Sequence, residues 1–181
     1  MLKVLSSIRF QTVKRPLVAS LMALGIAATP ATAQAIGPQA AACDRNGSAV
    51  LVHVEGIKAR TGMLRVQLYE ANPRTFLEKK KYLERVELPV PRSGPLSVCV
   101  AVPKPGSYAL YVRHDANNNG KSDKSSDGGG FSGNPHVSLL DLAFKRKPDL
   151  DKAKFAVGSS TREIRVILNY VQGLSFKPLG A

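Results

Sequence analysis

The sequence predicts an all-β protein, an antiparallel β-sandwich of about seven strands with one or two short helical turns. Apolar and polar residues alternate in several short segments, as they do in strands that bury one face. Gly- and Pro-containing turns separate these segments, and no long segment has helical periodicity. The 181 residues are 44% hydrophobic and 22% charged, which is typical of a globular chain and excludes a disordered or collagen-like one.

The first two predicted strands are Ala49–Ile57 and Met63–Ala71. Each places apolar side chains at alternate positions, with polar side chains between them. The five residues that join them contain Gly62, so the pair is predicted to form a β-hairpin. The next segment, Thr75–Arg85, breaks the alternation. Its Thr-Phe-Leu-Glu start matches a capping box, which predicts one or two helical turns.

Five further strands are expected, at Val86–Val90, Leu96–Val102, Ser107–His114, Ala153–Val157 and Arg162–Tyr170. Residues 158–161 make a short turn between the last two, so these are predicted to form a second hairpin. Ser138-Leu-Leu-Asp141 again resembles a helix start. Phe131 follows three glycines and is expected to pack back onto the sandwich.

Residues 1–33 have the pattern of a secretory signal peptide. Met1–Arg15 is basic and has no acidic residue, Leu17–Ala28 is apolar, and Ala31-Thr-Ala33 is a small-residue cleavage site. The apolar run is shorter than the ~20 residues that cross a bilayer, although an uncleaved anchor is the alternative. We therefore expect a periplasmic or secreted protein.

The remaining chain is expected to divide into a flexible leader at 34–47, a sandwich domain at 48–171 and a C-terminal tail at 172–181. The leader contains Cys43, and the other cysteine, Cys99, lies in a predicted strand. In an oxidising compartment two cysteines of a small domain are expected to form a disulfide. The alternative is a pair of buried free thiols. The absence of a C-x-x-C pattern argues against zinc binding and thioredoxin-type redox chemistry.

The charge is strongly basic, with 26 Lys and Arg against 13 Asp and Glu. Removal of residues 1–33 lowers the net charge from +13 to +9. In an exported protein this charge points to an anionic glycan or lipid rather than to nucleic acid. The densest clusters are Lys79, Lys80 and Lys81, and Lys145, Arg146 and Lys147. The alternative is that these side chains are merely solvated.

One loop has the spacing of calcium ligands. Residues 115–123 read DANNNGKSD, the first half of a D-x-[DN]-x-[DN]-G calcium loop. Position 12 of that pattern is Ser126 instead of glutamate, and Asp127 follows it. The alternative is ordinary turn chemistry, because Asn and Asp favour turns. The candidate ligands of a structural Ca²⁺ are the side chains of Asp115, Asn117, Asn119, Asp123 and Asp127 and the carbonyl of Lys121.

No pattern of catalytic residues stands out. The three histidines are His53, His114 and His136, and the sequence has no G-x-S-x-G and no H-E-x-x-H motif. A copper or zinc site of His53 and His114 would need their strands to be neighbours. The expectation is therefore that the protein is not an enzyme.

Three motifs together resemble a known bacterial family. They are G-x-L-R-V-Q-L-Y at Gly62–Tyr69, P-G-S-Y-A-L-Y-V-R-H-D-A-N-N-N-G-K-S-D at Pro105–Asp123, and G-G-F-S-G-N-P at Gly129–Pro135. The chain is similar over about Ser48–Tyr170 to the exported family called domain of unknown function 2141. The resemblance implies a small secreted or periplasmic β-sandwich, immunoglobulin-like or transthyretin-like, and supplies no catalytic residue. Members often have an acidic residue where this chain has Gly128–Gly130.

The leading functional hypothesis is an exported, non-enzymatic β-sandwich that binds an envelope component, with a loop at residues 115–127 ordered by calcium or by its own turn hydrogen bonds. The first alternative is a basic surface-binding module for anionic glycan or lipid. The second alternative is a metal-dependent enzyme, which requires the histidines to converge.

Overall fold

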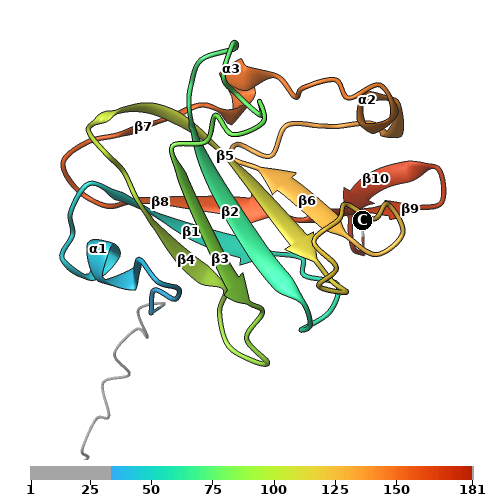
Figure 1. Ribbon diagram of the computed structural model, residues 1–181, viewed down its shortest axis with the longest axis horizontal. Coiled ribbons are helices and arrows are strands. Elements are labelled where there is room, and N and C mark those ends of the chain that lie inside the picture. The colour runs from blue at the N-terminus through green and yellow to red at the C-terminus, as the bar shows by residue number, and fades with distance from the viewer. Residues whose placement is uncertain (1–33, 181) are drawn as a thin grey trace, which may run out of the picture. The chain divides into compact units, whose positions relative to one another are not determined.

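The computed structural model describes residues 34–180, so the predicted signal peptide at 1–33 lies outside the described residues. Within that range the chain forms ten strands in two sheets and three short helices, and the predicted β-sandwich with short helical turns is confirmed (Figure 1). None of these helices is long and apolar enough to span a membrane. The elements are α1 (Ala40–Asp44), β1 (Ala49–Glu55), β2 (Met63–Glu70), β3 (Glu84–Pro89), β4 (Ser97–Ala101), β5 (Gly106–Asp115), β6 (Gly128–Phe131), α2 (Leu139–Ala143), α3 (Leu150–Ala153), β7 (Phe155–Val157), β8 (Arg162–Ile167), β9 (Asn169–Gln172) and β10 (Ser175–Pro178).

The smaller sheet has the strand order β4-β1-β8, and the larger sheet has the order β10-β9-β6-β5-β2-β3 with β7 paired to β5. Every strand pairing is antiparallel except that of β1 with β8, which is parallel. The alternating apolar residues of both sheets meet in one buried core. Its fully buried members include Val50, Val52, Leu64, Val66, Leu68, Val98, Leu110, Val112, Val166 and Leu168.

The predicted hairpin of Ala49–Ile57 with Met63–Ala71 is wrong, because β1 and β2 belong to different sheets. Both edges of β1 are occupied, by β4 on one side and β8 on the other. Its outward-facing Leu51 is also buried, because it packs with Cys99 and Cys43 in a small second cluster. Since β1 has no free edge, β2 pairs with β3 and β5 in the other sheet.

The second predicted hairpin is also wrong, because β7 pairs with β5 and β8 pairs with β1. The single strand expected at Arg162–Tyr170 is two strands. It changes sheets at Leu168, where β8 of the smaller sheet ends and the chain continues into β9 of the larger sheet. The residues predicted as a C-terminal tail, 172–181, contribute β10, which forms a hairpin with β9.

The helical turns predicted after Thr75 are replaced by hydrogen-bonded turns. Leu77 and Lys80 both have a φ of 61°, which a right-handed helix does not permit. Asn72 directs the start of the segment, since its side chain accepts a hydrogen bond from the N–H of Arg74 and its carbonyl accepts one from the hydroxyl of Thr75. The Thr75 hydroxyl therefore does not cap a helix.

The leader predicted to be flexible, residues 34–47, is attached to the smaller sheet. Ile36 N–H donates to the carbonyl of Ser97 at 2.8 Å, and Cys99 N–H donates to the carbonyl of Ile36 at 3.3 Å. The segment then forms α1, which ends beside the predicted disulfide. Cys43 and Cys99 are bonded, and the pairing is confirmed.

We predict that the Cys43→Ser/Cys99→Ser variant is less stable than the wild type by up to about 4 kcal/mol. The bond closes a loop with a sequence separation of 56 residues, and chain-entropy arithmetic gives about that value for such a loop. The denaturant midpoint measures the loss. The wild type in a reducing agent should match the double variant, and equal midpoints for the oxidised and reduced wild type would contradict the prediction.

Candidate functional site

A cavity of about 700 Å³ lies on the outer face of the larger sheet. Its floor is aromatic, since Tyr69 of β2, Tyr111 of β5 and Phe131 of β6 all line it. The rings of Tyr111 and Phe131 stack with centroids 5.1 Å apart, and Phe131 packs onto the sandwich as the sequence predicts. Burial raises the pKa of Tyr69 to about 12 and also raises the pKa of Tyr111. Both phenols therefore stay neutral and present uncharged rings.

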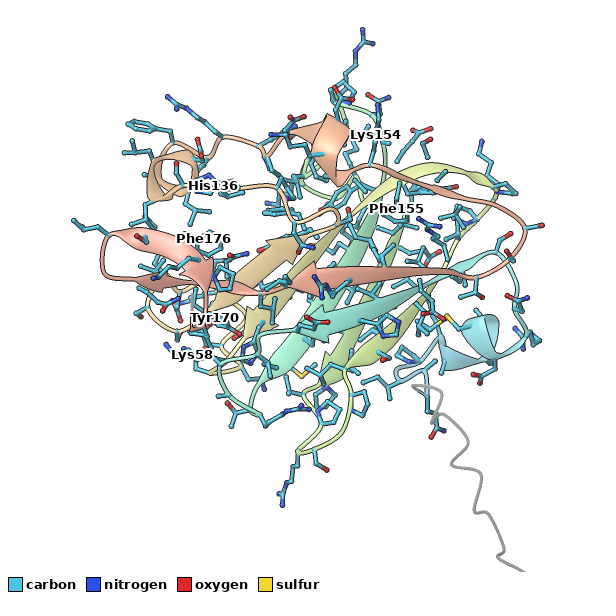
Figure 2. The ribbon with its side chains drawn as sticks, turned by 180° about the vertical axis from the view of Figure 1, so that it is seen from behind. Lys58, His136, Lys154, Phe155, Tyr170 and Phe176 are labelled. Atoms are coloured by element: carbon cyan, nitrogen blue, oxygen red, sulfur yellow. A yellow bond between two sulfur atoms is a disulfide. The ribbon has the colours of Figure 1, made fainter. Side chains whose placement is uncertain are left out.

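Two segments form the walls of the cavity. Val137 and Leu142 come from the loop and helix after β6, and Val171 and Phe176 come from the β9–β10 hairpin. In Figure 2, Phe176 lies just below the segment that carries His136. The predicted helix start is confirmed, because Ser138 and Asp141 form a capping box at α2. Hydrogen bonds from the Ser138 hydroxyl and N–H lower the pKa of Asp141.

The three glycines of β6 allow the C-terminal segment, which forms one wall of the cavity, to lie close to the strands that form its floor. Gly128 and Gly130 face the core, where an added Cβ would lie 2.4 Å from the Tyr170 ring and 2.5 Å from the Ile167 carbonyl oxygen. Both distances are too short for any side chain. Gly129 faces outward, where a Cβ would lie 3.3 Å from Tyr111. The lack of a side chain at Gly129 leaves the cavity open beside the aromatic floor.

The predicted calcium loop borders this cavity, and Arg113 is its central cation. The Nη2 of Arg113 lies 3.2 Å from the Asp115 carboxylate and 3.1 Å from that of Asp127. All three side chains are at least nine-tenths buried. Backbone N–H groups complete the arrangement, from Asn119 and Gly120 to Asp115 and from Ala116 and Asp123 to Asp127.

The other candidate ligands are engaged with each other. Asp123 accepts hydrogen bonds from the side-chain amides of Asn117 and Asn119. The amide oxygen of Asn117 accepts from the N–H of Asn119, and that of Asn119 accepts from the N–H of Lys121. A calcium ion would have to replace these bonds and turn both amides. Between residues 34 and 180, no three His, Cys, Asp or Glu side chains are grouped so that they could hold a metal ion. Calcium binding at this loop stays a prediction.

The electrostatics of the loop favour ionised carboxylates. Burial acts to raise the pKa of Asp115, but the hydrogen bonds from Arg113 and Gly120 outweigh it, and the pKa lies below its ordinary value. Hydrogen bonds from Asn117 and Asn119 likewise lower the pKa of Asp123. The buried Nε of Arg113 has no hydrogen-bond partner among the residues that the structure describes.

The two basic clusters of the sequence lie close together. Lys147 Nζ is 2.6 Å from the carboxylate of Glu78, the residue before Lys79–Lys81, and 3.4 Å from the carbonyl of Pro73. Lys145, Arg146 and Lys147 also line the cavity. We call the six exposed cations Lys79, Lys80, Lys81, Lys145, Arg146 and Lys147 the basic surface.

The histidines do not converge. His114 is fully buried in β5, where its Nδ1 lies 2.8 Å from the Tyr170 hydroxyl and its Nε2 lies 2.9 Å from the carbonyl of Thr61. Because Lys58 N–H donates to the same hydroxyl (Figure 2), Tyr170 can donate its proton to Nδ1 while Nε2–H donates to Thr61. His53 belongs to the other sheet, and His136 is exposed in the loop after β6.

His53 does take part in a row of polar side chains that the sequence analysis missed. Its Nδ1 lies 3.0 Å from the Ser97 hydroxyl and its Nε2 lies 3.2 Å from the Glu163 carboxylate. The order resembles that of a Ser-His-acid triad. Ser97 is only 1% exposed, so a substrate has no access to its hydroxyl. The row joins the three strands of the smaller sheet.

The cavity was also missed. Tyr69 and Tyr111 occupy the outward-facing positions of their strands, where the alternation predicts polar residues. These two aromatic residues are the sequence signal from which the cavity could have been predicted. Phe176 and Leu142 carry no such signal. They lie in a segment predicted as a tail and in a loop, and only the tertiary structure places them opposite each other.

We predict that Asp115→Asn makes stability less sensitive to acid. Because the folded-state pKa of Asp115 is lowered, its carboxylate stabilises the fold above the unfolded-state pKa of about 3.9. This contribution is lost as the pH falls through the folded-state value. Urea midpoints at pH 3 and pH 7 should therefore differ less in the variant than in the wild type. The control is Asp44→Asn, an exposed carboxyl without a hydrogen bond or ion pair among residues 34–180, which should keep the wild-type difference. An unchanged difference in Asp115→Asn would contradict the prediction.

Comparison with known proteins agrees with the resemblance seen in the sequence. A family model described as an uncharacterized protein conserved in bacteria (DUF2141) matches residues 52–165. This range includes β2 to β7 in full, parts of β1 and β8, the loop at 115–127 and most of the cavity. Neither the curated proteins nor the solved structures gave a match. The chain belongs to the DUF2141 family of bacterial proteins.

Proposed function

We propose that the protein is an exported, non-enzymatic binding module, periplasmic or secreted, that binds an anionic glycan or lipid of the cell envelope. The signal-peptide pattern at residues 1–33 supports export. The disulfide Cys43–Cys99 supports an oxidising compartment. The closer likeness to immunoglobulin-like or transthyretin-like modules stays a prediction.

One contact carries this proposal, the ion pair of Lys147 with Glu78 at 2.6 Å. It brings two basic runs that are far apart in the sequence to one place, at the border of the cavity. The six cations of the basic surface are all exposed, so they can reach a ligand without disturbing the core. Glu78 and Asp141 each pair with one of them, Lys147 and Arg146. The other four have no carboxylate partner within residues 34–180.

We propose that the protein is not an enzyme because of where its reactive side chains lie. His114 is held between Tyr170 and Thr61, and the Ser97 hydroxyl next to His53 is buried. The neutral tyrosines of the cavity floor provide contact surface for a ligand, and no described histidine lines the cavity. These features support binding more than chemistry.

We predict that retention on immobilised lipopolysaccharide or heparin depends on salt and on the basic surface. Exposed charges more than about 10 Å apart are largely screened at 0.1 M salt, so elution should occur at moderate salt. The Lys79→Gln/Lys80→Gln/Lys81→Gln variant should elute at clearly lower salt. The matched control, Arg45→Gln/Arg92→Gln/Lys104→Gln, loses the same charge at exposed sites outside the basic surface. It should elute close to the wild type. Equal shifts in both variants, or retention that ignores salt, would contradict the proposal.

A structural calcium ion is the second candidate, because Asp115, Asn117, Asn119 and Asp123 have the sequence spacing of the first half of a calcium loop. With few charged ligands, the expected affinity is on the order of 10⁻⁴–10⁻³ M. The thermal midpoint of the wild type should then rise in millimolar calcium and not in magnesium. The rise should be absent in Asp115→Ala/Asp123→Ala. A wild-type midpoint that calcium leaves unchanged rejects the ion and leaves Arg113 as the cation that orders the loop.

A further inference from the structure

We infer that the anionic ligand is a lipid, and that the protein docks on an acidic phospholipid surface with α2 and the β9–β10 turn. This inference rests on the proposed function and names the ligand class of the same site. It follows from apolar side chains that the fold exposes beside the basic surface. A glycan ligand would leave these side chains unexplained.

The first exposed group is on α2. Leu142 faces the cavity, whereas Leu140 and Phe144 are 63% and 67% exposed. These two are four residues apart, so they share the opposite face of this helical turn. The guanidinium of Arg146 lies 5.4 Å from the centre of the Phe144 ring. An exposed Leu-Phe pair next to cations is the pattern of a segment that lies in the interface of a bilayer.

The second exposed group is Leu174, which is 95% exposed. It lies with Gly173 in the two-residue turn between β9 and β10. Gly173 has a φ of 58°, which glycine adopts readily. The hairpin and α2 form facing walls of the cavity and lie at the same end of the large sheet in both views (Figures 1 and 2). Leu140, Phe144 and Leu174, which we call the apolar rim, therefore belong to the two segments that border one opening.

The charges around the opening complement an acidic surface. Four carboxylates line the cavity, and each has a partner: Glu78 with Lys147, Asp141 with Arg146, Asp127 with Arg113, and Asp123 with Asn117 and Asn119. Lys124 and Lys145 also line it and have no carboxylate partner in the part of the chain that the structure describes. With Arg113, Arg146 and Lys147, five cations line the cavity against these four carboxylates. The net charge of the lining is thus positive, where phosphate groups would lie if the apolar rim entered the acyl region.

The cavity itself suits part of a lipid. Its volume of about 700 Å³ is within the range of roughly 300–1,000 Å³ of small-molecule sites. Its floor and walls include the aromatic and apolar side chains of Tyr69, Tyr111, Phe131, Leu142 and Phe176, and charged side chains line the rest. An acyl chain of a lipid beneath the apolar rim can enter this space while its head group stays near Lys124 and Lys145.

The experiment uses the absence of tryptophan from the chain. In Leu174→Trp the new indole is the only one, and its emission should shift to the blue when vesicles of phosphatidylglycerol and phosphatidylcholine are added. Phosphatidylcholine vesicles alone should cause no shift. Ser93→Trp, in the exposed turn between β3 and β4, is the matched control and should not shift with either. In co-sedimentation, Leu140→Ser/Phe144→Ser/Leu174→Ser should lose affinity for the acidic vesicles by at least about tenfold. It should keep wild-type retention on heparin.

The outcomes separate the two proposals. Heparin retention without binding to acidic vesicles would overturn the lipid inference and leave the proposed function standing. Loss of both would overturn both. Vesicle binding with no blue shift of Leu174→Trp, or with no effect of the serine substitutions, would overturn docking through the apolar rim. A blue shift that grows with protein concentration in the absence of vesicles would also overturn it, because the rim would then be a contact between copies of the chain.

Discussion

The absence of side chains at Gly128 and Gly130 is the constraint on which the rest of the site depends. A Cβ at either position would collide with the Tyr170 ring or with the Ile167 carbonyl. Because β6 is bare on this face, the C-terminal strands cross closely over it and Tyr170 reaches His114. The same crossing directs the chain into β9 and β10, whose side chains form one wall of the cavity. The glycines of β6 thus connect the core, the buried histidine and the cavity.

Arg113 is the second residue that shapes the cavity, because it fixes the loop at residues 115–127. Its guanidinium holds Asp115 and Asp127, which lie at the two ends of the loop that a metal ion would otherwise have to gather. Removal of three charged groups from water is costly unless they are paired and hydrogen-bonded. Here backbone N–H groups donate further hydrogen bonds to the carboxylates of Asp115 and Asp127. The loop is thereby fixed against the sheet and closes one side of the cavity.

The features that support binding lie around one opening and come from separate parts of the sequence. The aromatic floor comes from β2, β5 and β6, the walls from the segment around α2 and from the β9–β10 hairpin, and part of the basic surface from the turns after β2. The apolar floor, the exposed leucines, and Lys124 and Lys145, which have no carboxylate partner among residues 34–180, together give the proposed site an amphiphilic character. A ligand that has both an acidic group and an apolar part matches all three.

The sequence by itself determined where most strands lie, the disulfide and the family, because alternation, cysteine count and local motifs are properties of short segments. Tertiary structure alone decided the strand partners. Alternation in β1 shows that one face is buried, but it contains no information about which strands occupy the edges. The capping-box motif at Thr75 did not form a helix, because the Thr75 hydroxyl donates to the carbonyl of Asn72 and Leu77 and Lys80 have a positive φ. The cavity depends on tertiary structure, because Tyr111 and Phe176, from distant parts of the chain, line it together only once the C-terminal strands lie beside β6.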